Sequence, residues 1–362
     1  MTDTSSLKSS AFDIACNWLA KGFRKQLSRG STISPEPEKV APPLSLASLE
    51  RKRLYHEGES GRYSARYRSA FVINFVLGLV AVAIALVPLA GVLGEHALHE
   101  FGPALTMAEM MCIVAILLFH IAGREQHHPS KLSKLLQKLG FKPNQAWRRK
   151  WVEHRLYGEQ LRYGVLFIGF PGEVIPPEHD ASHLLDMGLE SALRSWFESH
   201  GQACLTQPLD QASLKRYQDY LEFVIEEQRV YHGNNAARCN KIHHRLHGWA
   251  NLAFWLTLAG CALHLFWHAP LLSALAAFFP AMAATCHGII NAGEYAKLAD
   301  VSNKMQAALA LLQKQLAKAG AAGAPAQQAA ALRAVLLQLY ELTISEARGW
   351  HLALRDKDIQ VG

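Results

Sequence analysis

The sequence predicts an all-α integral membrane protein with four transmembrane helices, arranged as two parallel-repeat hairpins with cytoplasmic helical extensions. Residues 69–123 and 246–296 contain no lysine or arginine, and each stretch holds two apolar blocks. A helix needs roughly 20 apolar residues to cross the hydrocarbon core, and a lone apolar segment in lipid satisfies its backbone only as a helix. The predicted spans are residues 70–93, 104–122, 249–267 and 269–290.

The positions of the basic residues predict the orientation of these spans. The chain has a net charge of +7, and its lysines and arginines gather before the first and third spans and after the second and fourth. The connectors at residues 94–103 and around residue 268 carry none. The positive-inside rule therefore places both termini and the long middle region in the cytoplasm, in a multi-pass protein of the inner membrane. Anionic lipid accounts for the charge, so we expect the lipid bilayer as a partner and no nucleic acid.

Further helices are predicted around the first hairpin. Residues 1–46 comprise an amphipathic helix at 5–28, which lies on the inner leaflet or packs on the protein's own helices, and a proline-rich linker at 29–46. The first hairpin unit, residues 47–209, begins with a charged helix at 47–68 that runs into the first span. After the second span, helices are expected at 131–139, 146–163 and 181–199, and the apolar run 165–170 is either a buried strand or an interfacial turn.

The second hairpin unit, residues 210–362, begins with a long helix that starts after Asp210, with a bend expected at Gly233, and runs into the third span. A helix follows the fourth span at residues 294–318. It carries a coiled-coil-like seam formed by Leu298, Val301, Met305, Ala308 and Leu312. A linker at 319–325 then allows the last helix, 327–355, to pack back as an antiparallel hairpin.

A short motif, R-x-Y-H, occurs in both units. The first copy is Arg53, Tyr55 and His56, followed by Arg62; the second is Arg229, Tyr231 and His232, followed by Arg238. The spacing from histidine to the later arginine is the same, and each motif stands on a helix that enters an odd-numbered span. Two spans per unit give both units one orientation, so the pattern predicts a parallel duplication.

These features resemble the SLATT domains, two-transmembrane effector modules of prokaryotic conflict systems. The resemblance covers most of residues 47–362, with two hairpins in place of one. The residues that carry it are Arg229, Tyr231, His232, Asn235 and Arg238 before the second hairpin, Trp151, Glu159 and Arg162 after the first, and Glu346, Trp350 and Arg355 after the second. It implies a homo-oligomeric, pore-forming effector of antiviral defence, triggered through a sensor or nucleotide-signalling partner protein.

Polar residues inside the predicted spans are the candidates for a functional surface, because each is costly in lipid. They are Asn74, Glu109, His120, Asn251, His264 and His287. Asn74 and Asn251 lie early in odd-numbered spans, and His120 and His287 lie near the cytoplasmic ends of even-numbered ones. They either line a pore or hydrogen-bond between helices and hold the bundle together.

Catalysis, a cofactor and a metal site are not expected. The chain contains no Walker A sequence and no G-x-G-x-x-G, G-x-S-x-G or H-E-x-x-H. His243 and His247 stand at i and i+4 without an adjacent carboxylate, and the six cysteines form no C-x-x-C pair.

The leading hypothesis is a membrane effector that oligomerises and permeabilises the inner membrane when triggered, because four spans enclose little lumen in one copy. Two alternatives stay open. One is a non-conducting scaffold that docks a cytoplasmic partner through the seam at 298–312 and the helix at 181–199. The other is an ion or solute transporter, which the unmatched positions of Pro88 and Pro280 disfavour.

Overall fold

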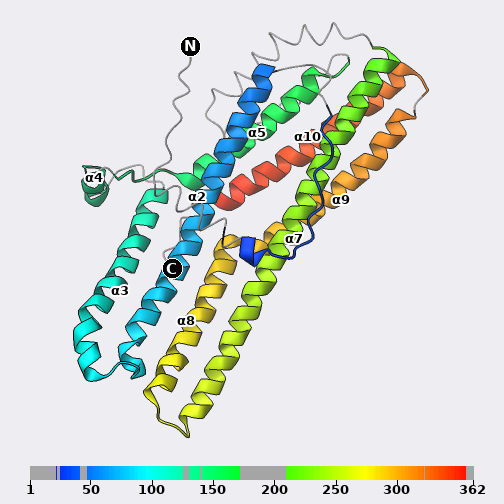
Figure 1. Ribbon diagram of the computed structural model, residues 1–362. Helices are drawn as coiled ribbons and strands as arrows, with labels where there is room; N and C mark the ends of the chain where they lie inside the picture. The colour runs from blue at the N-terminus through cyan, green and yellow to red at the C-terminus, as the bar shows by residue number, and fades with distance from the viewer. Residues whose placement is uncertain are drawn as a thin grey trace.

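The computed structural model describes residues 22, 25–40, 47–124, 130–138, 141–171, 209–321 and 323–355, and within them it contains helices and no strand (Figure 1). The all-α prediction is confirmed for this part of the chain. Its elements are α2 (Ala47–Leu86), η1 (Pro88–Ala90), α3 (Glu95–Gly123), α4 (Lys131–Lys138), α5 (Trp147–Ile168), α7 (Gln211–His264), α8 (Pro270–Gly293), α9 (Tyr295–Gly320) and α10 (Pro325–Arg355). The predicted helix at 181–199 lies outside the described residues.

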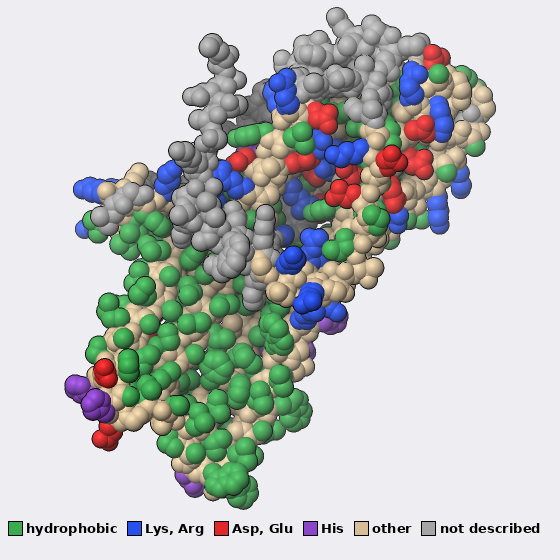
Figure 2. Space-filling model, in the orientation of Figure 1, with side chains coloured by type: hydrophobic (Ala, Val, Ile, Leu, Met, Phe, Trp, Pro, Cys, Tyr) green, Lys and Arg blue, Asp and Glu red, His purple; other side chains and the backbone are tan. Residues whose placement is uncertain are grey.

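The molecule has an apolar half, residues 69–123 and 246–293, and a polar half that contains α5, α9, α10 and the first parts of α2 and α7. The two long helices α2 and α7 pass through both halves (Figure 1). In Figure 2, hydrophobic side chains cover the visible face of the apolar half, and charged side chains gather over the polar half. This division follows the basic-free stretches of the sequence.

Three of the described helical stretches are long and apolar enough to cross a membrane: Leu49–Leu86, Glu95–Gly123 and Pro270–Gly320. They include the whole predicted second span and most of the predicted first and fourth spans. The predicted third span, the end of α7, is not among them; this part of α7 contains His247, Asn251, Thr257 and His264, and the helix ends at His264. A multi-pass membrane protein is compatible with these helices.

The first hairpin turns earlier than the sequence indicated. Helix α2 ends at Leu86 rather than at residue 93, and Pro88 begins the short η1. Proline lacks a backbone N–H and cannot continue a helical ladder, which explains the early end. Gly91 adopts a φ of 64°, and α3 starts at Glu95, so residues 95–103, predicted as a connector, form its first turns.

The two hairpins pack against each other through α2 and α8. Phe71 and Val72 of α2 share a buried cluster with Cys286, Ile289 and Ile290 of α8. The closest approach is at Gly288: a methyl group on this residue would lie 2.6 Å from Cζ of Phe75. Only glycine leaves room for the aromatic ring at this crossing.

The polar half has its own core, where α7 contacts α9 and α10 contacts α5, α7 and α9. The buried side chains that fill it are Tyr163, Leu166, Tyr217, Leu221, Ile225, Leu309, Leu316, Leu332, Leu336 and Leu339. Neither interpretation of the run 165–170 was right. Residues 165–168 are the last turn of α5, because Leu166 and Phe167 pack on this core.

Helix α9 buries the predicted seam within the chain. Leu298, Met305 and Leu312 are buried as expected, but Ser302 and Leu309 take the places between them that were assigned to Val301 and Ala308. Helix α10 returns alongside α9 (Figure 1). The seam thus packs against the chain's own helices, and this removes one motivation for a partner-docking scaffold.

The described part of the N-terminal segment, residues 25–40, packs on the protein's own helices. Leu27 is buried with α7, α8 and α9 side chains. The Arg245 guanidinium donates to the carbonyls of Gln26, Leu27 and Arg29, which end a helical turn. Helix α7 itself starts as predicted, with the carboxylate of Asp210 accepting from the N–H of Ser213 at 2.7 Å.

Candidate functional site

The two R-x-Y-H motifs lie in the polar half and share one further residue. Each arginine pairs with a glutamate three positions earlier: Arg53 with Glu50 at 3.5 Å, and Arg229 with Glu226 at 2.7 Å. The common motif is therefore E-x-x-R-x-Y-H. The glutamate could have been found from the sequence, because a glutamate three residues before an arginine on a helix is a common ion-pair spacing.

The tyrosines of both motifs are exposed, with exposed fractions of 62% for Tyr55 and 51% for Tyr231, and Tyr231 also lines a cavity. The later arginines differ. Arg62 lies 3.4 Å from Glu59 on its own helix, whereas Arg238 lines a cavity.

Both motif histidines lie close to α5: His56 of α2 contacts it, and His232 of α7 is near its charged side chains. Nδ1 of His56 is 2.9 Å from Nδ1 of His154, and this contact requires one ring to donate and the other to accept. Burial lowers the pKa of both rings, and the proximity of His154 lowers that of His56 further. His232 is only 3% exposed, and its electrostatic neighbours are Arg155, Glu159 and Arg162 of α5. Helix α5 thus brings the two motifs together.

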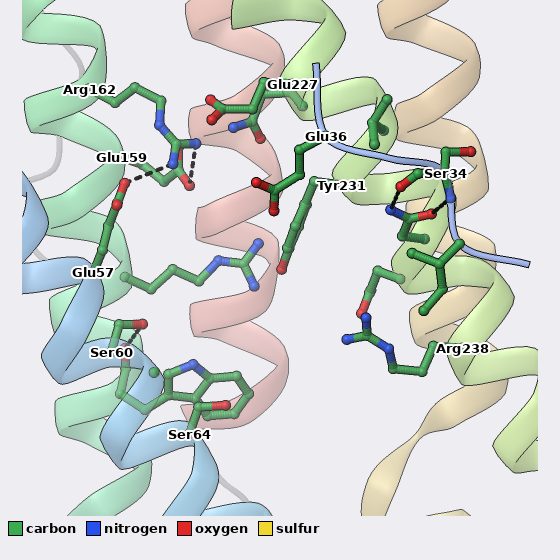
Figure 3. A pocket seen from close by; sticks show the side chains of 18 of the residues that line it. Ser34, Glu36, Glu57, Ser60, Ser64, Glu159, Arg162, Glu227, Tyr231 and Arg238 are labelled. Atoms are coloured by element: carbon green, nitrogen blue, oxygen red, sulfur yellow. Dashed lines mark hydrogen bonds and ion pairs between the residues drawn. The ribbon is translucent and has the colours of Figure 1, made fainter. Parts of the chain in front are cut away.

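A cavity of about 670 Å³ lies where α2, α5 and α7 meet, and the segment at residues 33–36 closes one side of it (Figure 3). That segment is fixed to α7 by two hydrogen bonds, from Ser34 N–H to Asn234 Oδ1 at 2.8 Å and from Asn234 Nδ2 to the Ser34 carbonyl at 2.9 Å. The charged residues of the lining are Glu36, Glu57, Arg68, Arg155, Glu159, Arg162, Glu227 and Arg238. We name this space the junction cavity.

Two of its arginines are held by carboxylates. Arg162 lies 2.8 Å from Glu57 of α2 and 3.1 Å from Glu159 of its own helix. Arg155 donates to both oxygens of Glu346 on α10 at 3.0 Å. Burial alone would lower the pKa of each guanidinium, but these carboxylates raise it above the ordinary value. The first unit is thereby tied to α10.

The residues that carry the family resemblance meet at this junction. The cavity is lined by Trp151, Glu159, Arg162, Tyr231, Asn235 and Arg238. Glu346 accepts a hydrogen bond from Arg155, another residue of the lining. The side chains of Trp350 and Arg355 lie outside the described residues.

In the apolar half, the two matched asparagines have different surroundings. Asn74 is completely buried, and neither its Oδ1 nor its Nδ2 has a hydrogen-bond partner. Asn251 is exposed, with its Nδ2 3.2 Å from Nδ1 of His247, whose ring centroid is 6.1 Å from that of His287. His247, Asn251 and His287 form a polar strip on the outer surface of α7 and α8. Within one chain, Asn74 and Asn251 share no surface.

The other predicted intramembrane residues do not gather at one place. Glu109 and His120 are both half-buried on α3. His264 lies at the far end of α7, with Nε2 3.5 Å from Ser273 Oγ. In the described part of the chain, no group of three metal-ligating side chains forms, and this includes the neighbourhood of His243 and His247.

The environment of His232 predicts a loss of stability in acid. Burial, with a contribution from Arg155, lowers its pKa to about 4 from 6.5. In the unfolded chain His232 is protonated below about pH 6.5, whereas in the folded chain it stays neutral down to about pH 4. The free energy of unfolding is therefore unaffected by this residue above pH 6.5 and falls as the pH is lowered from 6.5 toward 4. We expect about 2 kcal/mol less stability from this residue at about pH 5 than at about pH 7. Thermal unfolding of His232→Gln at both pH values checks this; a variant with the wild-type pH dependence contradicts it.

Comparison of the chain with protein-family models, with curated proteins and with solved structures gave no match, so the likeness to the two-transmembrane effector modules rests on the sequence features alone.

Proposed function

We propose that the protein spans the inner membrane four times, with the polar half and both termini in the cytoplasm. The support for a span at the end of α7 is its packing along α8 and its exposed apolar side chains. Leu252, Phe254 and Trp255 are 54%, 60% and 63% exposed. Such a surface is unfavourable in water and matches a lipid environment. Arg68 and Arg245 mark the cytoplasmic boundary by the positive-inside rule.

In this membrane the protein acts as a triggered effector that oligomerises and permeabilises the bilayer. The observation that carries this proposal is Asn74, whose amide is buried without a partner in an apolar bundle. An unmade hydrogen bond of this kind costs about 1–3 kcal/mol, and native structures keep few such groups. The described packing is then a resting state, and a rearrangement that exposes Asn74 to a water-filled lumen recovers the lost hydration.

The polar strip of His247, Asn251 and His287 supports the proposal that several copies of the chain associate in the membrane. Polar side chains on a lipid-facing surface are unfavourable, and they pair with one another or with a neighbouring helix. In the described packing Asn74 is buried and Asn251 is exposed, so the two line no common space. A second copy that packs on α7 and α8 would cover the strip. The oligomer then supplies the pore that the single bundle lacks.

The test is the membrane potential of cells after brief induction, reported by a voltage-sensitive dye. Wild-type protein is expected to depolarise the membrane. Asn74→Leu combined with Asn251→Leu should lower the rate of depolarisation at least about tenfold, because leucine removes the polar lining and fits the resting bundle. Immunoblots of the membrane fraction check that expression is equal.

Thr257→Val is the matched control, since it also removes a polar group from the end of α7. The Thr257 hydroxyl donates to the Ala253 carbonyl within its own helix, so its loss should leave depolarisation unchanged. Equal depolarisation by the wild type and the double asparagine variant would refute the lining role. The absence of depolarisation by well-inserted wild type under every stress applied would refute the effector proposal.

A further inference from the structure

The two arginines at the end of the junction cavity nearest the apolar half differ from the other two. Arg68 is the last basic residue before the first hairpin, and its guanidinium carbon lies 4.9 Å from the ring centroid of Trp151. Arg238 reaches into the cavity from α7 (Figure 3). Among the described residues, no carboxylate forms an ion pair with either guanidinium, whereas Arg155 and Arg162 are both paired. This end therefore carries two positive charges that no carboxylate of the described residues neutralises.

Arg68 and Arg238 line the same cavity. Burial raises the pKa of the Cys239 thiol, and the charges of Arg68 and Arg238 both act in the opposite direction, so both lie near this side chain. Ser64 lines the same end and offers a hydroxyl group (Figure 3).

The carboxylates lie toward the other end of the cavity. Glu227 and Arg162 occupy the upper part of the view in Figure 3, and Ser64 and Arg238 occupy the lower part. An anion is therefore attracted to the end near the apolar half and repelled from the opposite end. The polarity of the cavity fixes how an anionic ligand would be oriented.

We propose that Arg68 and Arg238 bind a phosphate group at this end of the junction cavity. Guanidinium groups donate paired N–H groups that match phosphate oxygens, and Arg68 is oriented for this by its stacking on Trp151. The cavity volume of about 670 Å³ is much larger than a phosphate ion, so the group belongs to a larger molecule. Its source is either the headgroup of an anionic phospholipid or a free phosphorylated molecule.

The purified full chain in detergent allows both sources to be tested by thermal unfolding. One titration uses short-chain phosphatidylglycerol below its micellar concentration, and the other uses inorganic phosphate at constant ionic strength. We expect at least one probe to stabilise the wild type. Arg68→Gln with Arg238→Gln should weaken its binding about tenfold for each arginine lost. Stabilisation by the lipid alone identifies a headgroup, and stabilisation by phosphate as well identifies a free phosphorylated ligand.

Lys297→Gln with Lys304→Gln is the matched control, because it removes the same charge from exposed positions on α9. Arg68→Lys with Arg238→Lys keeps the charge and removes the paired donors, so it tests the site even where the glutamine variant does not fold; we expect about fivefold weaker binding. The proposal is overturned if neither probe stabilises the wild type, or if the control loses as much affinity as the arginine variants. It does not depend on pore formation, which the depolarisation assay reports separately.

Discussion

Replacing Glu346 with glutamine is expected to lower the free energy of unfolding by about 3 kcal/mol. The side chains of Arg155 and Glu346 are 18% and 8% exposed, and the arginine donates to both carboxylate oxygens. Glutamine keeps the shape but removes the negative charge that lies closest to the buried Arg155 guanidinium. Chemical unfolding of the purified protein, followed by circular dichroism, measures the loss.

The exposed pair of Arg149 and Glu153 provides the comparison, since their side chains are 49% and 29% exposed. Glu153→Gln should change stability by no more than about 0.5 kcal/mol, as is usual for surface ion pairs. Combining Glu346→Leu with Arg155→Met should recover at least half of the loss, because both charges are then gone. A Glu346→Gln protein as stable as the Glu153→Gln protein would show that the pair is effectively solvated.

Gly288→Leu is expected to destabilise the protein by about 3 kcal/mol, because added side-chain atoms would overlap the Phe75 ring where α8 crosses α2. The overlap separates the two hairpins, so the loss should be visible in thermal unfolding in detergent. Phe75→Ala in the same chain makes room and should restore much of the stability.

Gly248→Leu is the control for this substitution, because a Cβ at Gly248 meets no atom within 4 Å. Leucine also has a higher helix propensity than glycine, so this variant should gain up to about 1 kcal/mol. Opposite signs at the two glycines are the expected result. Equal effects would mean that α2 and α8 do not pack through Gly288.

Much of the fold is encoded locally and could be predicted. The apolar blocks predict α3 and α8, and Asp210 predicts the start of α7 because its carboxylate caps the helix. The run 165–168 could not be assigned, because a short apolar segment is compatible with a strand or with a buried helical turn, and only the core formed by α7, α9 and α10 decides between them. The early turn at Pro88 was missed since hydropathy continues past it.

The site was predicted only in part, because it is assembled from three helices. The sequence identified Arg229, Tyr231 and Arg238 as special, but it gave no distance between the two motifs. It could not show that α5 lies close to both motifs or that Arg68 and Trp151 complete the junction cavity. Asn74 and Asn251 looked equivalent in sequence, and tertiary packing alone makes one buried and the other exposed.

Helix α7 has a mechanical consequence. Its 54 residues are uninterrupted, even at Gly233, where α9 approaches with Gln306, so it is a rod of roughly 80 Å at 1.5 Å per residue. Helix α2 is a second rod, of 40 residues. Neither helix is broken between the apolar half and the polar half of the molecule. A tilt of either helix in the apolar half is therefore transmitted to its continuation in the polar half. The boundary between α8 and α9, by contrast, is broken at Glu294, which adopts a φ of 46°. The backbone of the second unit thus changes direction at the level where α8 leaves the apolar half, whereas α7 continues through this level without a break.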